Sequence, residues 1–205
     1  NVNTPGGLAS NRLSDDNKWL TTNTLNLDRQ FGDLALGAVA GFSFETALYD
    51  FTYVEGRNFS SDALRNVSSA ATPTSTQNNR SQWALNSQFV RTNFRYKDRY
   101  IVEGSVRRDG SSRFGSENRY GTFWAVSGGW VVSEKKFMKG LGFLNQLKLT
   151  ASYGLNGNDR IGDFPSLGLF GSGVASDYSG GAGLRPTQIA NPDLKWETTT
   201  QLDLG

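Results

Sequence analysis

Long stretches in which polar and apolar residues alternate limit what this chain can fold into more than any other feature. The clearest stretch is 120–132, where mostly aromatic residues and valine occupy every second position and mostly glycine, alanine and serine lie between them. Side chains with a period of two point alternately to the two sides of a β-strand. The alternation therefore predicts an all-β chain whose strands each have one apolar face.

The first two stretches form a predicted hairpin. Residues 19–31 and 34–48 both alternate, and Phe31-Gly32-Asp33 between them is typical of a tight turn. Strands of soluble hairpins usually have about five or six residues, whereas a tilted strand needs about ten to cross a bilayer. Both predicted arms exceed that length, which favours strands that span a membrane.

Further strands are predicted downstream, and the pattern is that of an antiparallel meander. Lys97-Asp98-Arg99 is the predicted turn between two of them, and a short helix is expected only at 135–144. The final residues still alternate, so we expect the barrel to continue beyond this chain. The total is about eight strands; the remaining ones are at 83–96, 100–108, 120–132, 147–155, 163–170 and 198–205.

The connections between these strands alternate between short and long. The turns at 31–33 and 97–99 are minimal, whereas the long connections are rich in glycine, serine and asparagine. Transmembrane barrels have short turns on one side of the membrane and long loops on the extracellular side. We therefore expect long outer loops at about 49–82, 109–119 and 156–197, with a mobile low-complexity segment at 70–82.

Alternation does not by itself show whether the apolar face meets a protein core or lipid. Aromatic residues near the ends of the predicted strands favour lipid, because Trp and Tyr concentrate where a membrane meets water. No run approaches the roughly 20 apolar residues of a transmembrane helix. Some of the six aromatic residues considered lie near strand ends; the six are Trp19, Tyr100, Tyr120, Trp124, Trp130 and Tyr153.

The composition excludes several kinds of chemistry. The 205 residues include no cysteine and no histidine, so disulfides, cysteine nucleophiles and imidazole-based metal or catalytic sites are absent. No pair of carboxylates has a spacing suited to hydrolysis. A net charge of +2 gives little support for nucleic-acid binding. We expect no enzyme activity, no cofactor, no metal and no nucleic-acid partner.

A dense set of motifs lies between residues 91 and 205. The most extensive is Arg107-Arg108-Asp109-Gly110-Ser111-Ser112-Arg113-Phe114-Gly115, and Asn191-Pro192-Asp193-Leu194-Lys195-Trp196-Glu197 comes near the end. With Asn118-Arg119-Tyr120-Gly121-Thr122-Phe123 and Ala151-Ser152-Tyr153-Gly154 between them, this series resembles the SusC/RagA family of TonB-dependent outer-membrane transporters. One departure is Trp124, where family members often have proline.

The resemblance implies a large barrel of about 22 antiparallel strands, of which this chain is part of the wall. It implies that the protein is located in the outer membrane of a Gram-negative bacterium, in contact with outer-membrane lipid. It also implies import of oligosaccharides or peptides, a SusD-like lipoprotein partner at the extracellular mouth, and energy from the TonB complex. The plug domain, the motif that contacts TonB and both ends of the barrel are expected to lie outside these residues.

Three loop residues are candidates for binding the substrate, and each has a structural alternative. Tyr53 stacks on a sugar or packs beneath its loop. Arg113 binds a ligand or, as we favour, holds its loop through ion pairs together with Arg107, Arg108 and Asp109. Trp196 follows a predicted turn and stacks on a sugar or, as we favour, anchors the chain at the membrane interface.

Two other functions stay open at this point. The first is a soluble or surface-displayed β-rich module that binds carbohydrate or acts as an adhesin, and its apolar residues would face inward. The second is an outer-membrane barrel enzyme, whose catalytic base would come from a residue other than histidine.

Overall fold

The computed structural model describes residues 6–134, 146–172 and 176–205, and the fold is the predicted all-β antiparallel meander. None of the helices in this part of the chain is long and apolar enough to cross a membrane. The predicted helix at 135–144 lies outside the described residues. Two 3₁₀ turns, Val67–Ser69 and Val132–Glu134, accompany the strands. The strands are β1 (Leu8–Phe31), β2 (Leu34–Arg57), β3 (Thr72–Tyr96), β4 (Tyr100–Ser111), β5 (Tyr120–Val131), β6 (Lys148–Asn158), β7 (Leu169–Ser172), β8 (Leu184–Gln188) and β9 (Glu197–Leu204).

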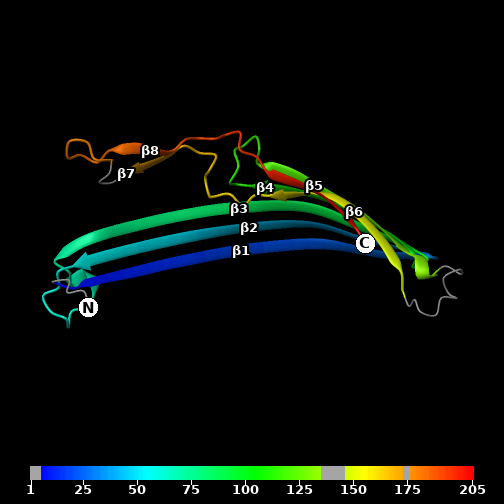
Figure 1. Cartoon of the computed structure of the whole chain (residues 1–205), viewed down its shortest axis with the longest axis horizontal. Helices are drawn as coiled ribbons and strands as arrows, with labels where there is room; N and C mark the ends of the chain where they lie inside the picture. Colours follow the sequence, from blue (N-terminus) through cyan, green and yellow to red (C-terminus); the bar gives the residue numbers. More distant parts are fainter. Residues whose placement is uncertain (1–5, 135–145, 173–175) are drawn as a thin grey trace. The chain divides into compact units, whose positions relative to one another are not determined.

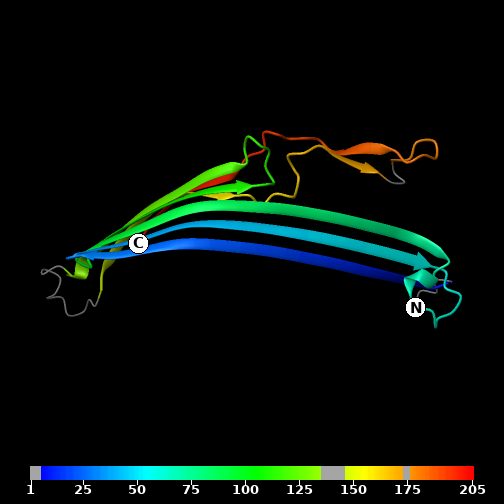
Figure 2. The same ribbon diagram turned by 180° about the vertical axis from the view of Figure 1, so that it is seen from behind.

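Seven of the strands form one sheet, in the order β1-β2-β3-β4-β5-β6-β9. Strands β7 and β8 pair only with each other, within the connection from β6 to β9 (Figure 1). Strands β4, β5, β6 and β9 lie side by side and can be followed from the opposite side in Figure 2. In the described part of the chain the sheet does not close, since β1 and β9 each have one neighbouring strand.

The chain divides into two compact units, and β1, β2 and β3 pass through both. The first unit comprises Asn1–Trp19 and Thr46–Trp83, and the second comprises Leu20–Glu45 and Ala84–Gly205. Within the first unit, the connection from β2 to β3 is held by backbone hydrogen bonds. The amide of Ala71 donates to the carbonyl of Asn58 at 3.1 Å, and the amide of Asn58 donates to the carbonyl of Gly7 at 3.3 Å.

In the second unit, the strand register sorts side chains onto two faces. Directly opposed residues share a face, and Val106 lies between Val90 of β3 and Trp124 of β5. We call this side the apolar face. Most of its large side chains are exposed in this chain, although Leu155 is half-buried. The exposed ones include Val90, Phe94, Val102, Val106, Trp124, Val126, Trp130, Leu149, Tyr153, Leu202 and Leu204.

The other side of the same strands, the polar face, has mostly charged and small side chains, although Phe89, Ile101 and Phe123 also lie on it. Glu103 is opposite Asn93 on one neighbouring strand and Ser127 on the other, and Ser152 is opposite both Ser127 and Asp203. The register therefore confirms the faces predicted from alternation, with Val126 on the apolar side and Ser127 on the polar side.

The predicted turns are confirmed. Gly32 has a φ of 57°, and Lys97 and Asp98 have φ of 52° and 53°. Positive φ matches the twist of tight hairpin turns, and glycine adopts it without steric cost. Tyr96 and Tyr100 flank the turn at 97–99 and are therefore directly opposite each other.

The predicted loop at 49–82 is wrong in most of its length. Strand β2 continues to Arg57 and β3 begins at Thr72, so the irregular connection is 58–71, and residues 72–82 are strand rather than a mobile segment. Strand β1 likewise begins at Leu8 rather than at residue 19. Hydrogen bonds to neighbouring strands stabilise these extensions, and such pairing requires no apolar face. The sequence of the extensions therefore contains only a weak alternation of polar and apolar residues.

Other predicted boundaries also need correction. Strand β4 runs to Ser111, which shortens the predicted loop 109–119 to 112–119, and β6 runs to Asn158. The predicted strand at 163–170 is wrong, because β7 begins only at Leu169 and pairs with the unpredicted β8. Val132 lies in a 3₁₀ turn and is buried, so it does not share the exposed face of β5.

Candidate functional site

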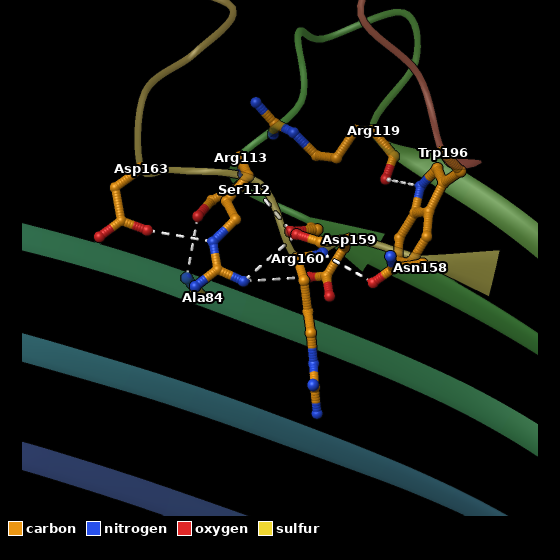
Figure 3. Close-up of polar contacts among 10 residues, drawn as sticks. Ala84, Ser112, Arg113, Arg119, Asn158, Asp159, Arg160, Asp163 and Trp196 are labelled. Carbon is orange, nitrogen blue, oxygen red and sulfur yellow. Dashed lines mark hydrogen bonds and ion pairs between the residues drawn. The ribbon is translucent and has the colours of Figure 1, made fainter.

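The charged motif around Arg113 lies in the second unit, where the connections that follow β4 and β6 and that precede β9 meet. Arg113 is in the connection from β4 to β5, and its guanidinium reaches two carboxylates that follow β6. Its Nε donates to Oδ1 of Asp163 at 3.0 Å, and its Nη1 donates to Oδ2 of Asp159 at 3.4 Å (Figure 3). The Arg113 side chain is 16% exposed, so these ion pairs are partly shielded from water.

An aromatic cluster joins the connection from β8 to β9 to the other two connections. The ring of Trp196 lies 5.1 Å from that of Phe114 and 5.2 Å from that of Phe123, and its Nε1 donates to the carbonyl of Arg119 at 3.1 Å. Phe114 is 2% exposed and Phe123 is 8% exposed. These three rings, which we call the loop-base cluster, form the main buried apolar group of the described part of the second unit.

The loop-base cluster depends on glycine at neighbouring positions. A Cβ atom at Gly157 or Gly121 would overlap the ring of Phe123. Both glycines therefore leave the space that the ring occupies, and this close approach requires the absence of a side chain.

A second network holds the start of the same connection. Arg107 Nε donates to Oδ1 of Asp109 at 2.6 Å, and Arg107 Nη2 donates to Oγ of Ser87 at 2.7 Å. Ser112 is tied to Ala84 in both directions, since its Oγ accepts from the Ala84 amide at 2.8 Å and its own amide donates to the Ala84 carbonyl at 2.9 Å. Arg107, Asp109 and Arg113 thus form ion pairs, whereas the contact of Arg108 is with the ring of Tyr120.

The candidate residues take different places. Arg113 and Trp196 meet in the same group of connections, and Trp196 packs in the loop-base cluster instead of joining the aromatic residues of the apolar face. The favoured prediction of Trp196 as an anchor at the membrane interface is therefore wrong. Its binding role stays a prediction, as does that of Arg113.

Tyr53 belongs to the first unit and lies in β2 rather than in a loop. Its hydroxyl donates to Oε2 of Glu55 at 2.7 Å, and Thr74 donates to Oε1 of the same carboxylate at 2.7 Å. The hydrogen bond to Glu55 raises the pKa of Tyr53. The hydrogen bonds from Thr74 and Tyr53 lower the pKa of Glu55. Tyr53 is half-buried, so part of its ring stays accessible.

The polar face contains an open groove of about 280 Å³ over β3 to β6 and β9. Arg91 and Glu103 form an ion pair at one side, with Nη2 and Oε2 2.7 Å apart, and Asp203 lines the other side. Ser127 and Ser152 form part of its floor. Donors and acceptors of this kind suit a hydrated wall along which a polar solute passes. No group of three potential metal ligands occurs among the described residues.

The sequence did not point to Asp159, Asp163 or Phe123 as parts of a site. Asp159 and Asp163 lie 46 and 50 residues from Arg113 in the chain, so no local spacing relates them. Gly121, two residues before Phe123, is a weak sequence signal, because glycine is frequent throughout this chain.

A sheet with one apolar and one polar face, minimal turns at one end and long connections at the other is typical of the wall of a transmembrane barrel. All residues from 1 to 205 match the family model described as TonB dependent receptor-like, beta-barrel. The chain belongs to this family, whose members are outer-membrane barrels of Gram-negative bacteria.

Individual relatives agree with this assignment. The chain is 38% identical over 192 residues to TonB-dependent receptor P39 of Formosa agariphila, which covers 89% of this chain and 18% of the relative. It is 37% identical over 126 residues to TonB-dependent receptor SusC of Bacteroides thetaiotaomicron, covering 59% of this chain and 13% of SusC. These matches confirm the resemblance to the SusC/RagA family.

Solved structures show the same fold. The chain is similar to the RagAB peptide transporter with a TM-score of 0.92 and 29% identity, over 98% of this chain and 23% of the solved one. The same importer in its "open-open" state matches with a TM-score of 0.89, 29% identity and the same coverage of this chain, over 22% of the solved one. The chain spans about a fifth of the length of the curated relatives that it matches over nearly its whole length.

Proposed function

We propose that this chain is part of the wall of an outer-membrane TonB-dependent transporter that imports oligosaccharides or peptides. The observation that carries the proposal is the exposed apolar face, which is continuous across β3, β4, β5, β6 and β9. Val106 is 53% exposed and Val126 is 46% exposed in this chain, although both belong to residue types that normally avoid water. Contact with lipid removes such a face from water without the need for a protein core.

The dimensions of the apolar face support a bilayer. Along β4, its aromatic borders are the row of Tyr100 and Trp130 at one end and the pair of Gly110 and Tyr120 at the other. Ten residues separate Tyr100 from Gly110, which is about 33 Å along a strand and about 25 Å along the membrane normal at a tilt of about 40°. The apolar band of outer-membrane barrels is about 25 Å tall.

In this proposal the polar face lines the lumen, and the long connections lie outside the cell. Tyr53, Arg113 and Trp196 are proposed to contribute to the extracellular substrate site. The half-buried ring of Tyr53 suits stacking on a sugar, whereas Arg113 and Trp196 position the connections around them. The protein has no catalytic role of its own, in keeping with a family of transporters and receptors.

The proposed partners follow from the relatives. RagAB is named as a peptide transporter and SusC as a TonB-dependent receptor, and the SusC/RagA family resemblance implies the partners. A SusD-like lipoprotein is therefore proposed at the extracellular mouth, and the TonB complex is proposed as the source of energy. Outer-membrane lipid surrounds the apolar face.

Uptake by the full-length protein tests the proposal. We expect cells that produce it to accumulate labelled oligosaccharides or peptides, and cells lacking either the protein or a functional TonB complex to lose that uptake. Uptake that persists without the TonB complex, or a full-length protein that partitions into the aqueous fraction, would contradict it. The latter result would favour a soluble β-rich binding module instead.

A further inference from the structure

The adjacent residues Arg107 and Arg108 of β4 point to opposite faces of the sheet. Arg107 lies on the polar face, where Asp109 neutralises it. Arg108 lies on the apolar face, directly opposite Gln88 of β3 and Thr122 of β5. Because guanidinium is a cation, the apolar face carries a positive charge at this position.

The position of Arg108 is held by a ring. Its Cζ lies 4.5 Å from the centroid of the Tyr120 ring, within the range of a cation–π interaction. The Tyr120 ring itself covers Gly110, where a Cβ atom would overlap it. The ring thus supports the guanidinium from one side, and the Arg108 side chain is exposed in this chain.

No carboxylate neutralises Arg108 within the part of the chain that the structure describes. The cation near the opposite border of the apolar face differs in this respect. Lys97 lies over the ring of Tyr96 at 5.3 Å, and its Nζ is also 3.6 Å from Oδ2 of Asp33. Arg108 therefore has the same kind of aromatic support as Lys97 but lacks the anionic partner.

Arg108 lies inside the apolar band, two residues from the border at Gly110 and Tyr120. It is two residues beyond the row of Val90, Val106 and Trp124, towards the long connections. In the proposed orientation this is the outer leaflet, and the long arginine side chain can extend from here to the lipid headgroups at the border. The anions that occur at that depth are phosphates, and guanidinium binds phosphate with two parallel hydrogen bonds.

We propose that Arg108, supported by Tyr120, binds a phosphate group of an anionic lipid of the outer leaflet. The site rests on the proposed function, because it requires the apolar face to lie in a bilayer. It would fix the height of β4 and β5 in the membrane and favour annular lipids that carry phosphate. The occupant is lipid, not free phosphate, because the neighbouring row of valine and tryptophan contacts the acyl chains at the same time.

Native mass spectrometry of the full-length protein tests the site. Detergent-solubilised protein is titrated with lipid A, with enzymatically dephosphorylated lipid A, and with inorganic phosphate. We expect lipid A to bind about tenfold more tightly than its dephosphorylated form, as for a hydrogen-bonded charge pair. Arg108→Gln should abolish that preference, and Tyr120→Leu should reduce it. Arg91→Gln is the matched control, since Arg91 is on the polar face and pairs with Glu103.

The outcomes separate the possibilities. An equal preference in the wild type and Arg108→Gln would overturn the proposal, as would complete displacement of lipid A by millimolar inorganic phosphate. Reduced recovery of a partner lipoprotein from Arg108→Gln, with lipid binding unchanged, would assign Arg108 to a protein interface instead. Each variant is first inserted into phosphatidylethanolamine vesicles. A wild type that does not insert contradicts the proposed function, whereas one that inserts without lipid preference contradicts only the lipid site.

Discussion

The two faces of the same five strands are stabilised in different ways. On the apolar face of β3 to β6 and β9, large side chains make cross-strand contacts such as the stacked rings of Tyr100 and Trp130, yet they stay exposed. On the polar face, ion pairs and the loop-base cluster hold neighbouring strands and connections together. One face therefore depends on its surroundings, whereas the other is stabilised within the chain. This difference indicates that the sheet requires an apolar environment only on its apolar face.

The largest effect that we expect comes from placing a charge on the apolar face. Val126 lies on the central strand of the band, opposite Gly104 and Tyr153. Val126→Arg should lower the free energy of unfolding of the full-length protein in lipid vesicles by about 2–4 kcal/mol, the cost of arginine on the lipid side at mid-depth. Equilibrium denaturation in urea measures this change in the free energy of unfolding.

Ser127→Arg is the matched variant on the polar face. Its side chain would enter the hydrated groove beside Glu103 and Ser152, so its effect should be much smaller. Equal losses for the two variants would show that the faces are assigned wrongly.

A smaller loss should follow from filling the space beside Phe123. Gly157→Ala places a methyl group against that ring and should cost about 1–3 kcal/mol, as other overpacked sites do. Hydrogen exchange of residues 189–197 should rise, because the displaced ring contacts Trp196. Gly128→Ala is the control, since a Cβ there meets no atom within 4 Å. If the two variants behave alike, the loop-base cluster is not close-packed.

Removing the guanidinium that joins two connections should weaken them locally. Arg113→Met leaves Asp159 and Asp163 without this partner, and we expect a loss of about 1–2 kcal/mol in the local opening of residues 158–163. Hydrogen exchange in the full-length protein measures this loss. Arg119→Met is a suitable control, because only the backbone carbonyl of Arg119 holds Trp196. Unchanged protection in Arg113→Met would show that the ion pairs contribute nothing to the loop.

The smallest effect concerns ion pairs of the first unit, which lies outside the proposed membrane-spanning segments. The hydrogen bond from Arg80 lowers the pKa of Asp50, and those from Thr74 and Tyr53 lower the pKa of Glu55. A carboxyl whose pKa is lowered by folding stabilises the fold at neutral pH and loses that contribution as pH falls through the lowered pKa. Protease resistance of residues 46–83 should therefore decline slightly below about pH 4.

Asp50→Asn provides the control for this pH dependence, because asparagine does not titrate. The variant should be less resistant at neutral pH and should change less on acidification. A wild type and variant with the same pH profile would mean that the Asp50 and Arg80 pair is fully compensated by water.

Sequence alone determined the strands that carry the apolar face and the direction in which each side chain points. Val126 and Ser127 were assigned to opposite faces correctly, and the turns at Gly32 and at Lys97 and Asp98 were found, because both signals depend on the local geometry of consecutive residues. The motif from Arg107 to Gly115 led to the right family for the same reason, since it is a continuous run of residues.

Only the tertiary structure decided how far β1, β2 and β3 extend and what the charged and aromatic loop residues contact. Strand β1 begins at Leu8, β2 ends at Arg57 and β3 begins at Thr72 because neighbouring strands supply hydrogen bonds. The polar residues 72–82 leave no apolar periodicity from which this could be predicted. Arg113 meets Asp159 and Asp163, and Trp196 meets Phe114 and Phe123, because the meander brings distant connections together at one end of the polar face. Such contacts are set by strand order and register, which no single stretch of sequence encodes.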